Sequence, residues 1–426
     1  MLFRRAVAVA AVTATTVCLL QGPASAKAPG NLDPSFNGAG QATTRVGSDA
    51  EVNVVAMHGQ NVVAGGWSQT PSGRVWSFVR YLSYGGLDTS FGNRGRVQLR
   101  LSDAQGAVDL SVLPGGKILA VGRAGRKFAL VRLTKTGHLD RTFGGGDGIV
   151  RTGFGQRGAS ATSLAMVGGG RVVVAGWSTS AGGFEQFALA RYLPGGKLDA
   201  SFGVDGKVLT DFWATNSEYS WVNDVLRWPG TNKVVAVGNT LRDGRTEWDV
   251  ALARYTAAGK PDRAFGGGNG KTRVSVPGGL IASAAVMQPH RSMLVGGYGS
   301  PTPGADAVLL RFRASGGLDL SWGGGDGIVT HDSVADDEFW HHLVRSGPDT
   351  IMVGEVAGDA AVLRVRPSGA LDPTFGSAGL AVTSFPGGNS LLRGVAIQDD
   401  GRIIAGGSAS AVGAANGFAL ERLLAQ

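Results

Sequence analysis

Cysteine is almost absent from this chain, which has a single copy, Cys18, among 426 residues. Cys18 lies within an apolar stretch, residues 6–20, that follows Arg4-Arg5 and precedes the small residues 24–26. A basic start, a short apolar segment and a small-x-small site are typical of a secretory signal peptide that is cleaved. The sequence therefore predicts a cleaved signal at residues 1–26 and a secreted protein that is stable without disulfides.

Charge clusters and long apolar runs are missing as well. The chain has 40 basic and 32 acidic residues, and its net charge of +8 comes from scattered side chains, which argues against a nucleic-acid partner. The apolar stretch at the start is too short and too rich in Ala and Thr for a membrane span. Since residues 27–426 show no helical periodicity, an all-β fold is predicted.

Motifs of known chemistry are also lacking. We find no Ser-His-Asp order, no zinc-ligand spacing, no nucleophile elbow and no lysine-ended phosphate loop. The sequence therefore favours a non-enzymatic protein with no cofactor.

Glycine, in contrast, is abundant at 70 residues, and it accompanies a motif that recurs seven times. The motif is Leu-Asp-x-Ser/Thr-Phe-Gly, with some variation, and its aspartates are Asp33, Asp88, Asp140, Asp199, Asp262, Asp319 and Asp372. A repeat of about 55 residues that is rich in glycine and short strands is typical of a stack or ring of equivalent units.

The second unit shows what each repeat contains. Strands are expected at residues 107–113, 117–122, 127–133 and 148–152, with glycine-rich turns between them. Four antiparallel strands repeated seven times predict a seven-bladed β-propeller, in which radial closure protects the strand edges. An open solenoid is the alternative, and it would need polar capping units.

The two ends of the chain complete one blade. Residues 27–426 begin with the motif and one expected strand, 41–46, and they end with three, at 391–397, 402–407 and 417–424. We therefore expect a single domain, residues 27–426, whose last blade is closed by strands from both termini.

The pattern LDxSFGxxGxV, PxGKIxxxG, FALxRY, repeated over residues 31–424, resembles the delta-60 repeat family of predicted bacterial β-propellers. The resemblance implies the propeller fold, a bacterial origin and export. It implies no particular chemistry, because the function of that family is mostly unknown.

Each unit also carries an arginine on its third strand, eight residues before the motif aspartate in six units; these are Arg80, Arg132, Arg191, Arg254, Arg311, Arg364 and Arg422. An arginine on a packed face needs a partner, and the aspartate is the nearest candidate. The aspartate can instead cap its own turn. Ring closure predicts an Arg422–Asp33 contact with the geometry of Arg132–Asp140.

An aromatic residue follows each motif aspartate, and packing between blades is the expected role; the set is Phe36, Phe91, Phe143, Phe202, Phe265, Trp322 and Phe375. The loops 143–148 and 322–327 each hold one carboxylate, Asp147 and Asp326, and Asp205 and Asn269 occupy the same place in their units. One carboxylate per loop predicts plain turns, with calcium as the alternative.

The sixth unit departs most from the repeat, and it gives the candidate ligand-binding residues Asp336, His341, His342 and Glu355. Glu355 is aligned with the glycine that ends the second strand elsewhere. His342 is aligned with Asn53, Asp109, Ser163 and Asp224 on the innermost strand. Because neighbouring strand residues point to opposite faces, His341 and His342 are not expected to bind one ion together. A solvated strand entry is the alternative interpretation.

The fourth unit is the longest and the richest in aromatics, and Trp213, Tyr219 and Trp221 are its candidate ligand-binding residues. Exposed aromatics on propeller loops favour a surface for sugars or proteins, whereas core packing is the alternative. The sequence thus predicts a secreted, monomeric binding platform for a protein or a glycan. The alternative function is a propeller enzyme, a lyase or hydrolase with its site near the sixth repeat.

Overall fold

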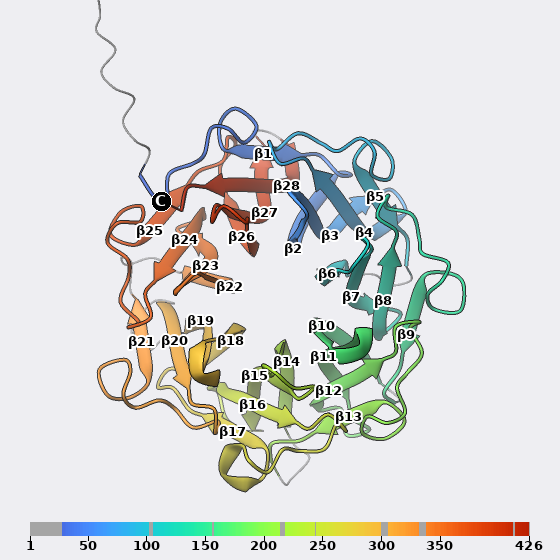
Figure 1. Cartoon of the computed structure of the whole chain (residues 1–426), viewed down its shortest axis with the longest axis vertical. Helices are drawn as coiled ribbons and strands as arrows, with labels where there is room; N and C mark the ends of the chain where they lie inside the picture. The colour runs from blue at the N-terminus through green and yellow to red at the C-terminus, as the bar shows by residue number, and fades with distance from the viewer. Residues whose placement is uncertain are drawn as a thin grey trace, which may run out of the picture.

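The computed structural model is a closed ring of seven four-stranded antiparallel sheets (Figure 1). It describes residues 28–425 except 102–104, 156, 214–217, 243, 300–305, 332–337 and 412–413. The predicted signal, residues 1–26, lies outside the described residues. The predicted seven-bladed, all-β fold is confirmed.

The first four blades follow the chain from the innermost strand outward. They comprise β2 (Asp49–His58), β3 (Asn61–Thr70), β4 (Gly73–Tyr81) and β5 (Arg96–Leu99); β6 (Ala107–Val112), β7 (Ile118–Ala124), β8 (Lys127–Leu133) and β9 (Ile149–Thr152); β10 (Ala159–Val167), β11 (Arg171–Thr179), β12 (Glu185–Tyr192) and β13 (Lys207–Thr210); and β14 (Glu218–Arg227), β15 (Val234–Arg242), β16 (Asp249–Tyr255) and β17 (Lys271–Val274).

The remaining three blades have the same order. They comprise β18 (Leu280–Met287), β19 (Met293–Gly299), β20 (Asp306–Phe312) and β21 (Ile328–His331); β22 (Glu338–Ser346), β23 (Asp349–Val356), β24 (Asp359–Val365) and β25 (Leu380–Thr383); and β26 (Ser390–Ile397), β27 (Ile403–Ala411), β28 (Ala414–Leu423) and β1 (Gln41–Thr44). Three short turns are 3-10 helices, η1 (Gly168–Gly170), η2 (Gly266–Gly268) and η3 (Pro289–Arg291). The described part of the chain contains no helix with the length and hydrophobicity of a membrane span.

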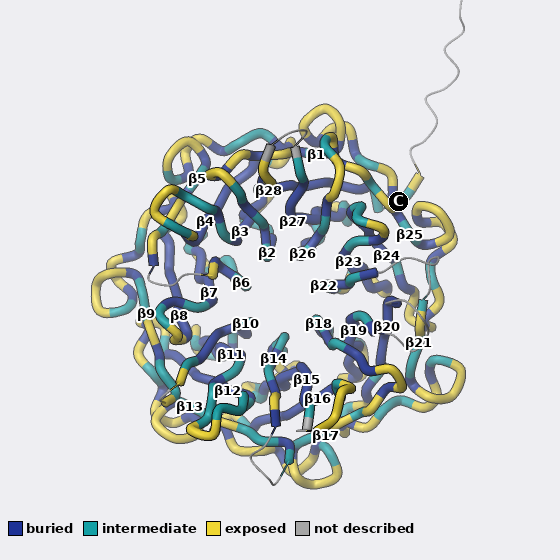
Figure 2. Tube along the Cα trace, turned by 180° about the vertical axis from the view of Figure 1, so that it is seen from behind, coloured by how far each residue is buried: buried dark blue, intermediate teal, exposed yellow. Residues whose placement is uncertain are grey.

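Hydrophobic packing between neighbouring blades forms the core, and exposed turns surround it (Figure 2). Phe91 of the first unit, for example, shares a buried cluster with Phe78 of its own blade and with Leu110 and Val131 of the next. All seven motif aromatics are buried. The predicted packing role of this aromatic position is therefore confirmed.

The repeated arginine and aspartate form an ion pair in every unit, with Nε–Oδ2 distances of 2.7 to 3.4 Å. Arg132 shows the pattern. Its Nε lies 2.7 Å from Asp140, and its Nη1 donates to the carbonyl oxygen of Pro194 in the next blade. Asp140 also accepts the backbone N–H of Thr142, so it caps its turn as well. The pair is therefore a connection between blades, and both structural interpretations hold together.

The predicted contact that closes the ring is confirmed. Arg422 Nε lies 2.9 Å from Asp33 Oδ2, and Arg422 Nη2 donates to Ser35 as Arg132 Nη2 donates to Thr142. The strand β1 pairs with β28 in the same sheet. The first and last segments of the chain thus complete one blade.

Every innermost strand contains a one-residue bulge that faces the axis of the ring. The bulged residues are Asn53, Val108, Thr162, Asn223, Ser283, His341 and Arg393, and the residues that follow them are Val54, Asp109, Ser163, Asp224, Ala284, His342 and Gly394. The alignment of Asn53 with His342 was therefore wrong by one residue. Asn53 shares the column of His341, because a bulge adds one residue to only one of two paired strands.

The bulge explains why the second strand ends in a glycine, because it brings the backbone of the innermost strand too close for a side chain. In the sixth blade it is Gly354, which pairs with Trp340, and a Cβ there would lie 2.0 Å from the carbonyl oxygen of Phe339. No side chain fits at that distance. The alignment of Glu355 with this glycine was wrong, and Glu355 occupies the next position, opposite Phe339.

Candidate functional site

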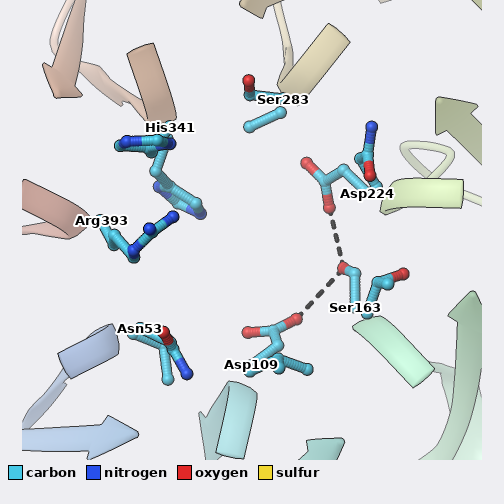
Figure 3. A pocket seen from close by; sticks show the side chains of 13 residues that line it. Asn53, Asp109, Ser163, Asp224, Ser283, His341 and Arg393 are labelled. Carbon is cyan, nitrogen blue, oxygen red and sulfur yellow. Dashed lines mark hydrogen bonds between the residues drawn. The ribbon is translucent and has the colours of Figure 1, made fainter. Parts of the chain in front are cut away.

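The bulges of the innermost strands line a central cavity of about 210 Å³ (Figure 3). Side chains of the first four blades bind the backbone of the following blade there. Asn53 and Thr162 donate to the carbonyl oxygens of Ala107 and Val222, at 2.9 and 2.6 Å. Such hydrogen bonds satisfy the backbone groups that each bulge removes from its sheet. This half of the ring therefore has a structural role.

The residues after the bulges extend the same pattern to the backbone N–H groups. Asp109 accepts the N–H of Leu164 at 2.8 Å, and Asp224 accepts that of Ala285 at 2.9 Å. Ser163 lies between the two aspartates, with its Oγ 3.1 Å from Asp109 and 2.9 Å from Asp224. Figure 3 shows this chain of three polar side chains on one side of the cavity.

A serine hydroxyl has one proton and cannot donate to two carboxylates at once. One carboxyl group must therefore hold a proton when both contacts are hydrogen bonds. The pKa of Asp109 is raised to about 7, mainly by burial and in part by the charge of Asp224, against the opposing hydrogen bonds. When Asp109 holds the proton, it donates to Ser163, which donates to Asp224.

The opposite side of the cavity carries His341 and Arg393 (Figure 3). His342 lines the same cavity. The bulge at His341 lets both histidines reach one cavity, so the expectation that they point to opposite faces is wrong. Among the described residues, His341 Nε2 and His342 Nδ1 have no hydrogen-bond partner. These two nitrogen atoms thus make none of the inter-blade bonds seen in the first four blades.

Burial also determines the protonation of the two histidines. It lowers the pKa of His341 to about 3, and the charge of Arg393 adds to this shift. Burial lowers the pKa of His342 too, although Asp224 opposes the shift. Both imidazoles are therefore neutral at pH 7. The described residues contain no group of three or more His, Cys, Asp or Glu side chains arranged to hold a metal ion.

A groove opens from this side of the cavity toward the face where the innermost strands begin. One part, of about 460 Å³, is lined by Tyr298, Phe339, Glu355 and Arg393, together with His341. The adjoining part, of about 260 Å³, shares Tyr298 and Phe339 and adds a third aromatic side chain, Trp248. We call these two parts the mouth groove. Its aromatics come from the fourth, fifth and sixth blades.

The three aromatic rings are half-buried, and each packs against another aromatic ring. Tyr298 and Phe339 meet edge to face with centroids 5.2 Å apart, and Trp248 packs on Trp221 at 4.2 Å. Such arrangements are favourable and leave ring surface available to a ligand.

The structure divides the residues predicted from the sequence. His341 and Glu355 line the mouth groove, and Trp221 supports it through Trp248. His342 lines the central cavity. Asp336 lies outside the described residues.

The other two aromatics of the fourth unit lie elsewhere. Tyr219 is 39% exposed and packs on Phe184 of the third blade. Trp213 is half-buried and is covered by the guanidinium of Arg273, 3.4 Å from the ring centroid. The structure therefore does not bring Trp213 and Tyr219 into the mouth groove.

The sequence analysis did not identify Tyr298 and Arg393 as groove residues. A feature of the sequence could have indicated Tyr298. It directly follows the glycine that ends a second strand, as Trp67, Trp177 and Glu355 do in their units. In the fifth and sixth blades this variable position, next to a required glycine, supplies Tyr298 and Glu355 to the mouth groove.

The glycine-rich loops considered for calcium are closed by their own side chains. Asp147, Asn269 and Asp326 each accept the backbone N–H two residues later at 2.9 Å. These bonds are those of ordinary Asx turns.

Comparisons with known proteins agree with the fold. A family model described as "Domain of unknown function (DUF5122) beta-propeller" matches residues 113–143 and 170–202. No curated protein matches the sequence. Together with the seven-bladed ring, the match supports a propeller repeat family, and the delta-60 resemblance stays a prediction.

Several solved structures are similar in fold. The polysaccharide lyase Uly1 is 10% identical with a TM-score of 0.51, over 90% of this chain and 91% of that one. A protein of unknown function from Dyadobacter fermentans is 13% identical with a TM-score of 0.45, over 91% and 100%. The propeller domain of the trilobed protease from Pyrococcus furiosus is 9% identical with a TM-score of 0.43, over 90% and 95%. At 10% identity, the similarity to the polysaccharide lyase supports the fold and nothing more.

Proposed function

We propose that this protein is a secreted, non-enzymatic binding module whose mouth groove binds a glycan. The observation that carries the proposal is the convergence of three half-buried aromatic side chains, Trp248, Tyr298 and Phe339, on one groove. Polar side chains, Glu355 and Arg393, lie in the same groove.

Sugar rings suit this combination. The C–H faces of a pyranose are apolar and flat, so they stack on aromatic rings, while its hydroxyl groups need polar partners. The two parts of the groove, about 460 and 260 Å³, have the size of small-molecule sites, which occupy roughly 300–1,000 Å³.

Two titratable side chains of the groove are unsuited to catalysis. A general base must have a pKa near the working pH. The pKa of His341 is lowered to about 3, and burial raises the pKa of Tyr298 above its ordinary value. Neither side chain takes a proton from a substrate efficiently at pH 7.

A propeller enzyme, a lyase or hydrolase, is the second candidate function. It is favoured by Asp109, whose pKa of about 7 suits a general acid or base, and which lines the same central cavity as His342 of the sixth unit. Product release from a polysaccharide panel, abolished in Asp109→Asn, would support this candidate.

Binding to a glycan array, followed by calorimetry on the best ligand, tests the proposed function. We expect Tyr298→Ala to weaken binding about tenfold or more, because a well-packed aromatic anchor contributes ~1.5–3 kcal/mol. The matched control is Tyr84→Ala. Tyr84 is 59% exposed in the turn between β4 and β5, outside the groove, and its removal should leave affinity unchanged. Equal loss in both variants, or no glycan bound, would contradict the proposal.

Export is part of the same proposal and rests on the leader-like residues 1–26. N-terminal sequencing of the exported protein should find Lys27 first.

A further inference from the structure

The charges around the mouth groove do not cancel. Arg393 forms an ion pair with Glu51, which neutralises the positive charge at the inner end. His341 is uncharged at neutral pH, because burial and Arg393 lower its pKa. Two carboxylates, Glu355 in the inner part and Glu247 in the outer part, remain.

Glu355 is the more informative of the two, because it is half-buried. Among the described residues we find neither a hydrogen bond nor an ion pair to its carboxylate, and Arg393 is engaged by Glu51. Burial raises the pKa of Glu355, the charge of Arg393 opposes this shift, and the charge of Glu51 adds to it. The net rise reflects the cost of holding the charge of Glu355 away from water. A half-buried carboxylate of this kind is stabilised when a cation binds next to it.

The aromatic side chains add a second preference for a cation. Tyr298 and Phe339 line the same part of the groove as Glu355. The faces of such rings carry negative electrostatic potential and attract an ammonium group. An acidic sugar would instead bring its carboxylate or sulfate toward Glu355 and lose energy by repulsion.

We propose that the mouth groove selects a glycan with free amino groups, placing an ammonium group against Glu355 while the sugar ring covers the aromatic side chains. This inference rests on the proposed function and names its ligand class. A lysine side chain also offers an ammonium group, but its flexible stem has no flat face to stack on Trp248 or Phe339. The observations therefore favour an amino sugar over a basic peptide.

The test compares two oligosaccharides of equal length, a chitosan oligomer with free amines and a chitin oligomer with acetylated amines. Calorimetry is done at a slightly acidic pH that keeps the sugar amine protonated. We expect the chitosan oligomer to bind about tenfold or more tightly, since a charge-assisted hydrogen bond replaces a neutral amide contact. Glu355→Gln should remove this preference, so that the variant binds the two oligomers with equal affinity.

Glu185→Gln is the matched control. Glu185 is also half-buried, and burial raises its pKa too, but it lies at the start of β12 in the third blade, outside the groove. We expect this variant to keep the full preference. A preference that falls equally in both variants would overturn the inference, because a general loss of charge would then explain it.

The remaining outcomes separate this inference from the proposed function. Equal affinity of the wild-type protein for the two oligomers would overturn the amino-sugar inference while glycan binding stands. No binding of any glycan would overturn both. Tighter binding of oligolysine than of the chitosan oligomer, weakened by Glu355→Gln, would identify a basic peptide as the occupant and overturn the sugar.

Discussion

Aspartate has opposite electrostatic behaviour in two places of this fold. At Asp88, burial acts to raise the pKa, but bonds from Ser90 and the charge of Arg80 outweigh it and hold the pKa below its ordinary value. At Asp109, burial prevails and the pKa rises to about 7. Asp109 is desolvated more strongly than Asp88, and it has a second carboxylate, Asp224, nearby where the motif aspartate has a guanidinium partner.

Glu421 gives a prediction for the pH dependence of stability. This glutamate of β28 is fully buried, and burial raises its pKa from 4.5 to about 7, although Thr383 and Gln41 donate to it. A carboxyl group with a raised folded-state pKa contributes stability at low pH. That stability is lost as the pH rises from about 4.5 through 7.

We therefore expect Glu421→Gln to gain stability over the wild-type protein by ~3 kcal/mol between pH 4.5 and pH 7.5, since the amide never ionises. Thermal unfolding of both proteins across this range measures the difference. A difference that stays constant with pH would show that Glu421 ionises freely in the folded protein.

At the scale of the strand, sequence periodicity predicted much of the structure. The third strand of the second unit was expected at residues 127–133 and is found as β8 at Lys127–Leu133. The errors arose at the bulge. Alternation along one strand cannot reveal where an extra residue sits, because that depends on the partner strand. Asn53 and Glu355 were both misplaced by one residue for this reason.

The mouth groove could not be predicted from sequence periodicity, for a different reason. Trp248, Tyr298 and Phe339 belong to three units, and no spacing rule joins them until the ring brings their blades together. The sequence did indicate the units concerned, because the fourth and sixth are the irregular ones. The regular fifth unit between them supplied the missing residue, Tyr298.

The ion pair that closes the ring gives a prediction at the same scale. Asp33→Ala leaves Arg422 without its carboxylate, and the side chain of Arg422 is only 4% exposed. Breaking a buried pair from one side costs about 3 kcal/mol or more. We expect a clear fall in the thermal midpoint.

Asp319→Ala is the control for this change. Asp319 also accepts bonds from a serine two residues later, but its partner Arg311 is 31% exposed and lies 3.4 Å away. Water can solvate that arginine, so the midpoint should fall less. An equal fall in both variants would mean that the ion pair at the ring closure stabilises the protein no more than the exposed pair of Asp319 and Arg311.

For the whole molecule, stability depends on keeping the ring closed without a native disulfide. The closing blade is the only sheet of the described chain that combines strands from both ends, because β1 pairs with β28. Its interface with neighbouring blades resembles the others in burial. Opening this one pairing would expose the edges of β1 and β28 together.

A disulfide across the closing pair should therefore stabilise the protein more than the same bridge elsewhere. Thr43 and Ala419 are direct partners in β1 and β28, and Leu209 and Ala188 are the equivalent partners in the third blade. The closing bridge would span about 375 residues and the control about 20. By chain entropy this corresponds to ~6 against ~3 kcal/mol. We expect Thr43→Cys/Ala419→Cys, oxidised in a chain beginning at Lys27, to raise the thermal midpoint over its reduced form about twice as much as Ala188→Cys/Leu209→Cys does. Equal gains would contradict the chain-entropy argument, because the long closing bridge would then restrict the unfolded chain no more than the short one does.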